Sequence, residues 1–274
     1  MKKTISGMLA FYLAACIVLA SLVVAMPLIG SKRYMVEARG GIIHETFTES
    51  IVYSVKEDDE EYSNPYRLPL YYSPYTNTCA VTAGGVAIAY FDISYPNLIP
   101  NSSGFEIGTT YLYPAQGSTG SAVNNMFAEL YEMTNSSDNG TTIPDFKSGM
   151  EEYVESKGYD LTMTDIYSNH LDFEACKTAL EAGKLVTVFV DGFSVYDNEI
   201  RYDGYDTMTC TVVNGAHTLT AYGYSVIKYY DASMNIVAEY EFLLVQSGMP
   251  TLGLTRLRVD SGCTIDDAYV LDVN

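Results

Sequence analysis

The sequence predicts an α+β domain that follows an N-terminal apolar segment. Residues 4–31 contain no charged side chain. Between residues 79 and 182, apolar residues recur at the spacing of helices, and from residue 185 onward they alternate or cluster as in strands. Helices followed by a run of mostly antiparallel strands are typical of α+β proteins. We therefore expect a helical half packed on a sheet, with a cleft where the two halves meet.

The N-terminal segment has the features of an export signal or a membrane anchor. Lys2-Lys3 precede the uncharged run Thr4–Ser31, which is long enough to span a bilayer as a helix. The run also fits a secretory signal peptide, with Val23-Val24-Ala25 as a tolerable cleavage site. Its length and the following Lys32-Arg33 favour an uncleaved anchor. We expect residues 1–31 to be a signal anchor that spans the cell membrane once, with the domain outside the cell, or a signal peptide whose cleavage leaves the domain secreted.

Residues 32–66 are expected to form a spacer or a short pro-region. Residues 43–52 alternate in the manner of a strand or hairpin that packs beside the domain. The acidic run Glu57–Glu61 is followed by Ser-Asn-Pro and predicts a solvated connector. The folded domain is then expected to cover residues 67–274.

Cys79 lies where a turn-rich loop changes into a helix. Residues 73–77 include Ser, Pro and Asn, which indicate a loop, and Thr78 is a candidate N-cap. The small and apolar residues 79–92 predict a helix that is buried on most of its surface. The first turn of a helix has unpaired amides and a positive dipole end, and both favour a thiolate, the reactive form of cysteine.

His217 is the expected partner of this cysteine. It opens an alternating stretch, His217–Tyr224, which predicts a strand that is entered through the small-residue turn Asn214-Gly-Ala. A nucleophilic cysteine needs an imidazole that takes its proton and later returns it to a leaving group. A cysteine at a helix start and a histidine at a distant strand start have the sequence layout of a papain-type site.

The remaining elements follow from periodicity. Helices are predicted at residues 121–133, 142–157 and 172–182, and a long surface loop at residues 97–119. Gly84-Gly85 fall within the first helix and predict close packing rather than a phosphate loop. Strands are predicted at residues 185–190, 209–213, 218–224, 225–230, 237–246 and 268–273.

Four motifs in order resemble the bacterial C39-like members of the papain-like cysteine peptidases. The Cys79 helix ends in Tyr90-Phe91-Asp92, and Leu180-Glu-Ala-Gly183-Lys-Leu-Val186 precedes a strand. Gly215-Ala-His217 and Gly223-Tyr224 then resemble the histidine motif of the family. The match covers roughly residue 68 to the C-terminus. It implies a papain-like fold and an extracytoplasmic cysteine peptidase that acts on peptides or proteins through Cys79 and His217, without a cofactor.

Two family positions are not matched, and this leaves the activity open. The glutamine that usually lies several residues before the cysteine, and helps to bind the oxyanion, is replaced by Ser73; Asn77 could supply an amide instead. The residue that orients the histidine is normally Asn or Asp. Gln246 falls at that position. The alternative is therefore an inactive papain-like domain that binds peptides or proteins at the cell surface.

Composition excludes some classes of function. Of 15 basic residues, four flank the apolar segment, which leaves 11 against 34 acidic residues and a charge of about −23 on the rest of the chain. Nucleic-acid binding requires a basic face and is not expected. Five cysteines without CxxC spacing and three histidines do not predict a metal site. A bridge between Cys210 and Cys263 is possible if the domain is exported.

Overall fold

The computed structural model describes residues 34–37, 43–63, 66–102, 104–108, 110–117, 120–202 and 204–274. All of them belong to one compact unit, Tyr34–Asn274. The predicted membrane segment, residues 1–31, lies outside the described residues. Among those that are described, no helix combines the length and the apolar character needed to cross a bilayer.

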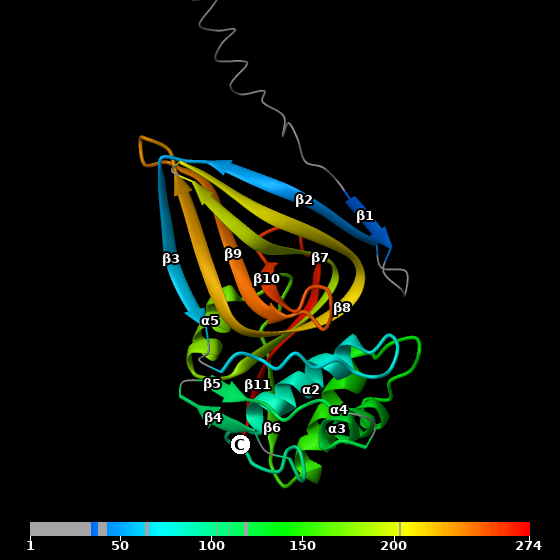
Figure 1. The fold of residues 1–274 in the computed structure, drawn as a ribbon. Coiled ribbons are helices and arrows are strands. Elements are labelled where there is room, and N and C mark those ends of the chain that lie inside the picture. The colour runs from blue at the N-terminus through cyan, green and yellow to red at the C-terminus, as the bar shows by residue number, and fades with distance from the viewer. Residues whose placement is uncertain are drawn as a thin grey trace, which may run out of the picture. The chain divides into compact units, whose positions relative to one another are not determined.

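Antiparallel sheet is the main structure of this unit (Figure 1). The described strands of the large sheet follow the order β1-β2-β8-β9-β10-β7-β11-β6, and β8 also pairs with β3 and with β7. A separate small hairpin consists of β4 and β5. The strands are β1 (Tyr34–Glu37), β2 (Ile43–Val52), β3 (Val55–Ser63), β4 (Phe105–Ile107), β5 (Thr110–Leu112), β6 (Leu161–Asp165), β7 (Leu185–Tyr202), β8 (Tyr205–Tyr230), β9 (Ile236–Gln246), β10 (Leu254–Arg258) and β11 (Ile265–Val273).

Two long strands organise the sheet. β7 has 18 residues and β8 has 26. Because β8 pairs with β7 and β9, and β10 pairs with both β9 and β7, these four strands close into a ring. From the sequence, both strands were predicted to end at polar and glycine residues such as Asp191-Gly192 and Asn214-Gly215. The chain passes the first of these pairs as an irregularity in the β7–β8 register, without ending the strand.

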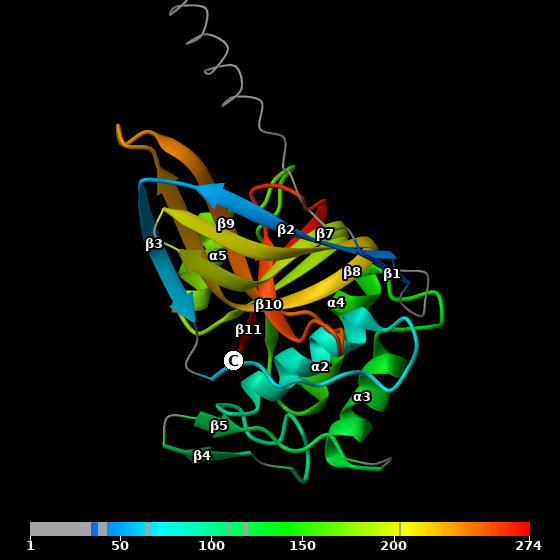
Figure 2. The same ribbon diagram turned by 45° about the horizontal axis from the view of Figure 1, so that its top comes forward.

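The helices are α2 (Cys79–Phe91), α3 (Ala122–Met133), α4 (Ile143–Ser156) and α5 (Phe173–Glu181). α2, α3 and α4 pack together below the ring of strands, and α5 lies beside β7 and β8 (Figures 1 and 2). α3, α4 and α5 lie where they were predicted because each has a strong start signal. Ser121, Thr142 and Asp172 accept hydrogen bonds from backbone N–H groups three residues later.

Close packing explains the paired glycines of α2. A Cβ atom on Gly84 would lie 2.6 Å from the Sδ atom of Met150, and one on Gly85 would lie 2.4 Å from Cε1 of Phe127. Met150 and Phe127 are fully buried in α4 and α3. The two glycines therefore let α2 approach its neighbours closely, as the sequence predicted.

The predicted fold class is corrected by this structure. The expectation was a papain-like α+β fold with a helical half on a sheet half, and an N-terminal membrane segment. The structure is instead mostly antiparallel sheet, with 43% strand and 22% helix. The difference has two sources. β7 and β8 are much longer than predicted, and the region expected to be spacer and connector contributes β2 and β3, which both pair with β8.

The acidic run Glu57–Glu61 lies within β3, where a solvated connector was predicted. β3 pairs only with β8 among the described strands. A strand at the border of a sheet presents unpaired backbone groups to other chains, and charged side chains discourage such pairing. A run of acidic residues is therefore compatible with a strand at this place.

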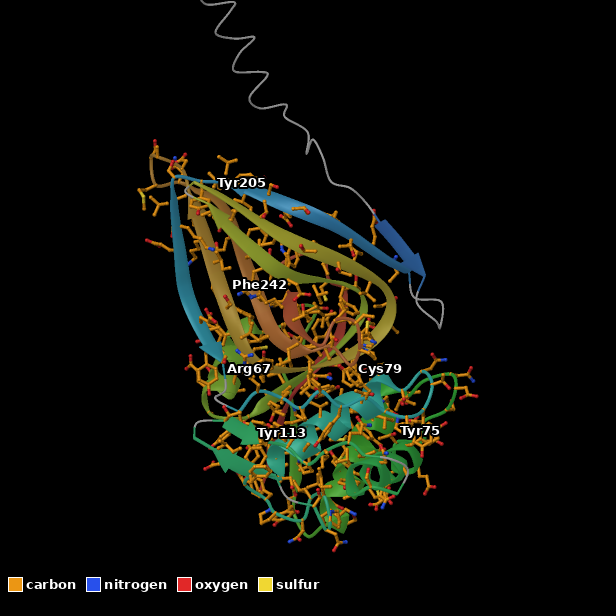
Figure 3. All side chains as sticks on the ribbon, viewed as in Figure 1. Arg67, Tyr75, Cys79, Tyr113, Tyr205 and Phe242 are labelled. Carbon is orange, nitrogen blue, oxygen red and sulfur yellow. The ribbon has the colours of Figure 1, made fainter. Side chains whose placement is uncertain are left out.

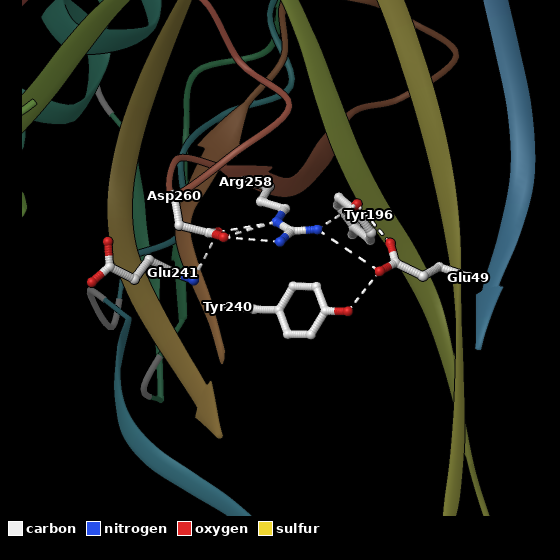
Figure 4. A network of polar contacts seen from close by, with 6 residues as sticks. All are labelled: Glu49, Tyr196, Tyr240, Glu241, Arg258 and Asp260. Atoms are coloured by element: carbon white, nitrogen blue, oxygen red, sulfur yellow. Dashed lines mark hydrogen bonds and ion pairs between the residues drawn. The ribbon is translucent and has the colours of Figure 1, made fainter. Parts of the chain in front are cut away.

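A polar network joins strands of the ring to β2 (Figure 4). The hydroxyls of Tyr196 and Tyr240 donate to the two oxygens of Glu49, at 2.8 and 2.6 Å. Arg258 donates to both oxygens of Asp260, and its guanidinium lies 4.2 Å from the ring centroid of Tyr240. Since these residues come from β2, β7, β9 and the β10 region, the network fixes the relative positions of those strands.

A second cluster is centred on Asp206, whose side chain is fully buried. Lys56 forms an ion pair with it at 2.9 Å, and the hydroxyls of Tyr53 and Tyr229 donate to it at 3.0 and 3.2 Å. The cluster ties the β2–β3 hairpin to both ends of β8. A buried carboxylate is tolerated only because charge and hydrogen bonds compensate its desolvation.

Asp206→Asn should lower the free energy of unfolding by about 3–5 kcal/mol, because it removes the counter-charge of a nearly buried lysine. Urea denaturation followed by circular dichroism measures this change. Lys56→Met combined with Asp206→Asn removes both charges while the amide oxygen can still accept from the two tyrosines. The double variant should be more stable than Asp206→Asn alone; equal or lower stability would contradict an ion pair as the source of the effect.

Candidate thiol–imidazole site

Cys79 is the first residue of α2 and is partly exposed (Figure 3). Every later residue of α2, from Ala80 to Phe91, is buried. The preceding turn bends through Asn77, whose φ of 55° lies in the left-handed region that asparagine tolerates better than most residues. The nucleophile candidate therefore lies where a buried helix reaches the surface.

The start of α2 has unpaired amides. Thr78 is the N-cap residue, but its side chain makes no cap hydrogen bond and instead donates to the carbonyl of Tyr75 at 2.9 Å. The first helical hydrogen bond runs from the N–H of Thr82 to the carbonyl of Thr78. Within the described chain we find no acceptor for the N–H groups of Cys79, Ala80 and Val81. Such a helix start can accept a negative oxygen.

His217 is held from two sides in the middle of β8. It is 7% exposed, and its ring stacks on Phe193 of β7 with centroids 5.4 Å apart and an interplanar angle of 18°. Its Nε2 atom lies 2.6 Å from the carbonyl oxygen of Ser247, just after β9. Because a carbonyl only accepts, Nε2 carries the hydrogen. This leaves Nδ1 as the nitrogen that can exchange a proton with another group.

Cys79 and His217 shift the pKa values of each other. Burial would raise the pKa of the Cys79 thiol, but a hydrogen bond and charge interaction with His217 lower it below the ordinary value, with help from Thr218. Burial would lower the pKa of His217, but the same interaction with Cys79 and the Ser247 carbonyl raise it. The two groups titrate as a pair, and their interaction stabilises the thiolate and the imidazolium relative to the isolated groups.

Thr218 supplies a further contact to the sulfur. The Cys79 thiol lies 3.9 Å from the hydroxyl oxygen of Thr218, which is the residue after His217 on β8. Two residues further, the hydroxyl of Thr220 donates to the carbonyl of Ala83 in α2 at 3.1 Å. These threonines bind the first turns of α2 to the histidine strand and so fix the separation of the thiol and the imidazole.

The other described cysteines have a different electrostatic environment. Burial raises the pKa of Cys176 to about 12, of Cys263 to about 12, and of Cys210 above its ordinary value. All four described cysteines are free thiols, so the possible bridge between Cys210 and Cys263 is not formed. Among them, Cys79 alone has a lowered pKa. Its position, rather than cysteine chemistry in general, favours the thiolate.

The structure brings Cys79 and His217 together and places Asn77 and Gln246 differently. The Asn77 amide is exposed and donates to the carbonyl of Asp138 at 2.7 Å. The Gln246 amide donates to the carbonyl of Tyr71 at 3.1 Å, and its oxygen accepts from the N–H of Gly248 at 2.6 Å. Neither contact involves the thiol or the imidazole.

Sequence reasoning missed the group that holds the imidazole, because it is the carbonyl of the residue next to Gln246. Any residue has a carbonyl, so the amino acid at position 247 gives no signal. Gln246 bonds to Tyr71 and to Gly248, and thereby holds the turn that contains Ser247. Gly248 has a φ of 71°, and a Cβ atom there would lie 3.6 Å from Nε2 of His217. The turn therefore passes directly against the ring.

Gln116 was also missed. Its oxygen accepts from the backbone N–H of Tyr72 at 3.0 Å, and its amide donates to the carbonyl of the same residue. This pairing mimics a strand contact and holds the loop that leads to Cys79. The N–H of Ser73 in the same loop donates to the hydroxyl of Thr82 in α2 at 2.9 Å. A lone glutamine in a predicted loop gave no hint of this role.

Two concavities of the described chain, of about 310 and 460 Å³, are lined by other residues than Cys79 and His217. Residues Asn214–Ala216, immediately before His217, are exposed. No cluster of three or more His, Cys, Asp or Glu residues in the described ranges could hold a metal ion.

The pH dependence of alkylation tests the Cys79–His217 pair. With a lowered pKa, Cys79 should reach half its maximal rate with iodoacetamide below about pH 8.5, where an ordinary thiol titrates. In His217→Ala, burial acts on the thiol without the imidazole, so the midpoint should move above the ordinary value. Peptide mass mapping gives the rate at each cysteine, and the partly exposed Cys263 is the internal control. Identical pH profiles for wild type and variant would show that His217 does not lower the pKa of Cys79.

Gln246→Leu tests whether this residue positions the histidine through the turn. The variant loses the bonds to Tyr71 and Gly248, so the Ser247 carbonyl should no longer hold the ring firmly. We expect alkylation of Cys79 at pH 7 to slow about tenfold while the fold persists. A circular dichroism spectrum like that of the wild type checks the fold. If the rate and pH midpoint stay unchanged in a folded variant, Gln246 has no part in positioning His217.

Comparison of this chain with models of protein families, with curated proteins and with solved structures finds no match. The resemblance to C39-like peptidases therefore stays a prediction from four short motifs. The geometry of Cys79, His217 and Ser247 is the basis for inferring a function.

Proposed function

We propose that this chain is a cysteine peptidase that hydrolyses peptide bonds with Cys79 as nucleophile and His217 as acid and base. One observation carries the proposal: a partly exposed thiol at a helix start has its pKa lowered by a buried imidazole, which is itself held through Nε2. Nucleophile, base and orienting group are the three parts that such catalysis needs. The proposal rests on this site and not on a fold class.

In the first step, the Cys79 thiolate attacks the carbonyl carbon of a peptide bond. The carbonyl π electrons move onto oxygen, and the resulting oxyanion lies within reach of the Cys79 N–H at the positive end of α2. The intermediate collapses, the C–N bond breaks, and the His217 imidazolium gives its proton to the leaving amine. The products are a free amine and a thioester on Cys79.

In the second step, neutral His217 removes a proton from water, and the hydroxide attacks the thioester carbonyl. The C–S bond breaks, a carboxylic acid leaves, and the sulfur returns as a thiolate beside the imidazolium. Throughout, the Ser247 carbonyl accepts the Nε2 hydrogen and keeps Nδ1 directed toward the chemistry. No cofactor is required for this sequence of steps.

The pairing of β8 favours a polypeptide as the substrate. β2 pairs with β8 up to Val213, and β9 pairs with it from Thr220 onward. The segment between them is paired with β7 alone at residues 216–219, and Asn214 and Gly215 have no strand partner among the described residues. An extended peptide could add to such a segment through main-chain hydrogen bonds. This would bring a peptide carbonyl beside His217 and Cys79.

One feature favours a second function, an inactive domain that binds peptides or proteins. The side-chain amides of Asn77 and Gln246 are both engaged elsewhere, so neither reaches an oxyanion in this structure. A site that relies on backbone N–H groups alone lacks a donor whose loss commonly costs a factor of about 100–1,000 in rate. The same exposed segment of β8 would then serve binding only.

We place the site outside the cytoplasm, at a membrane or in the secreted fraction. This part of the proposal rests on the uncharged run Thr4–Ser31 of the sequence. Free thiols at Cys176, Cys210 and Cys263 do not argue against it, because burial raises their pKa values and keeps them protonated.

Turnover of an unfolded protein substrate separates peptidase from binding domain. Wild type should release new amino termini, measured by an amine-reactive dye, and Cys79→Ala should abolish this release. Cys263→Ala is the matched control, since it removes a partly exposed thiol with a raised pKa and should keep full activity. If wild type binds peptide as tightly as Cys79→Ala but releases no amine, the binding function is the correct one.

A further inference from the structure

Exposed apolar side chains gather at one end of the strand ring. The set that we call the apolar end comprises Val52, Val55, Tyr205, Met234, Ile236 and Val237. Their exposed fractions run from 37% for Val55 and Tyr205 to 75% for Val52. Single exposed apolar residues are common, but a contiguous group marks an interaction surface.

The pairing of the strands places these residues together. Val52 is the register partner of Tyr205, and Val55 that of Tyr230. Tyr230 in turn pairs with Ile236 across the β8–β9 hairpin. The β2–β3 corner therefore lies beside the β8–β9 turn, as both views show (Figures 1 and 2). The Tyr205 label lies at the same end in Figure 3.

The β8–β9 turn is built to hold an apolar side chain outward. The carboxylate of Asp231 accepts from the N–H groups of Ser233 and Asn235 and from the Asn235 amide, at 2.8, 2.9 and 3.0 Å. Met234 follows with a φ of 62°, a conformation that is unfavourable for a side chain of this type. It is 55% exposed, so packing within the fold does not offset that cost. A strained backbone that holds a largely exposed apolar side chain suggests a function.

The entry of the chain into the fold indicates what covers this surface. Tyr34 in β1 pairs with Thr46 of β2, six residues before Val52. Six residues of strand span about 20 Å. Only Lys32 and Arg33 lie between the uncharged run Thr4–Ser31 and Tyr34 in the sequence. The sequence therefore tethers the folded unit, and with it the apolar end, within reach of a bilayer that holds this run.

We propose that the apolar end inserts into the surface of a lipid bilayer and orients the domain on it. The inserted side chains come from three turns, so the contact fixes the tilt of the domain and not only its distance from the membrane. The β4–β5 hairpin, with the exposed Phe105, lies at the opposite end of the unit (Figure 1). It would therefore face away from the lipid. This role is independent of the proposed peptidase activity.

Charges near the apolar end select the kind of lipid. Glu57 and Glu239 are exposed beside it, and Asp231 holds the turn. Lys228 pairs with Glu239 at 3.5 Å, while Lys56 is turned inward to Asp206. The rim is therefore acidic and would be repelled by anionic headgroups. Insertion should be deeper in a neutral, zwitterionic phospholipid bilayer than in one rich in anionic lipid.

Single tryptophans can measure the insertion, because the chain contains no tryptophan. Met234→Trp and, in a second protein, Ile236→Trp report on the apolar end, and Phe105→Trp is the matched control at the other end. Each full-length protein is reconstituted into vesicles of zwitterionic lipid, with or without bromine atoms on the acyl chains. Tryptophan emission of the first two variants should shift to shorter wavelength and lose more than about half its intensity in brominated lipid. Phe105→Trp should show neither effect.

Three outcomes would overturn the proposal. Unquenched emission from Ile236→Trp in a vesicle-bound, folded protein shows that the apolar end stays in water, even where Met234→Trp fails to fold. Equal quenching of Phe105→Trp shows that the domain has no preferred orientation. An emission shift that follows the protein-to-lipid ratio, without quenching, assigns the surface to contact with a second copy of the chain.

Discussion

The constraint on which the whole arrangement depends is the continuity of β8. One end of this strand pairs with β2 and β7, and the other with β3 and β9. Its central residues 214–219 pair with neither β2 nor β9, because the pairing with β2 ends at Val213 and that with β9 begins at Thr220. α2 packs against β8, and its start reaches this uncovered part. The meeting of a helix start with an imidazole is therefore a consequence of how a very long strand is shared between its neighbours.

The chemistry of the site comes from a competition between burial and pairing. Cysteines in this fold are pushed toward the neutral thiol by desolvation, as Cys176 and Cys263 show. Cys79 experiences the same desolvation, but His217 and Thr218 more than offset it. Burial opposes the charged form of His217 in the same way, and the thiol and the Ser247 carbonyl restore it. Each group therefore makes the charge of the other possible, so neither would have its altered pKa alone.

Local signals allowed much of the helical part, and the pairing of Cys79 with His217, to be predicted. Ser121, Thr142 and Asp172 cap the helices that they were expected to begin, and the change from loop to helix before Cys79 lies in the sequence itself. The sheet was harder, because strand ends were assigned at polar and glycine residues such as Gly215. Long-range pairing overrides such local breaks when both neighbours are in register. The acidic β3 gave no strand signal, since its pairing with β8 depends on residues far away in the chain.

The support of the site could not be predicted, because it uses backbone groups and distant contacts. Gln246 was predicted to orient His217 directly but makes different contacts. Its amide donates to the carbonyl of Tyr71, in the loop before Cys79, and its oxygen accepts from the N–H of Gly248, the residue after Ser247. One buried side chain thus joins the loop that leads to Cys79 with the turn that holds His217. A displacement of either loop must therefore move the other. This coupling maintains the distance between the sulfur and the imidazole. An amide can do this because it donates and accepts at once. A carboxylate at the same position could accept only, and the two loops would then be held by one bond in place of two.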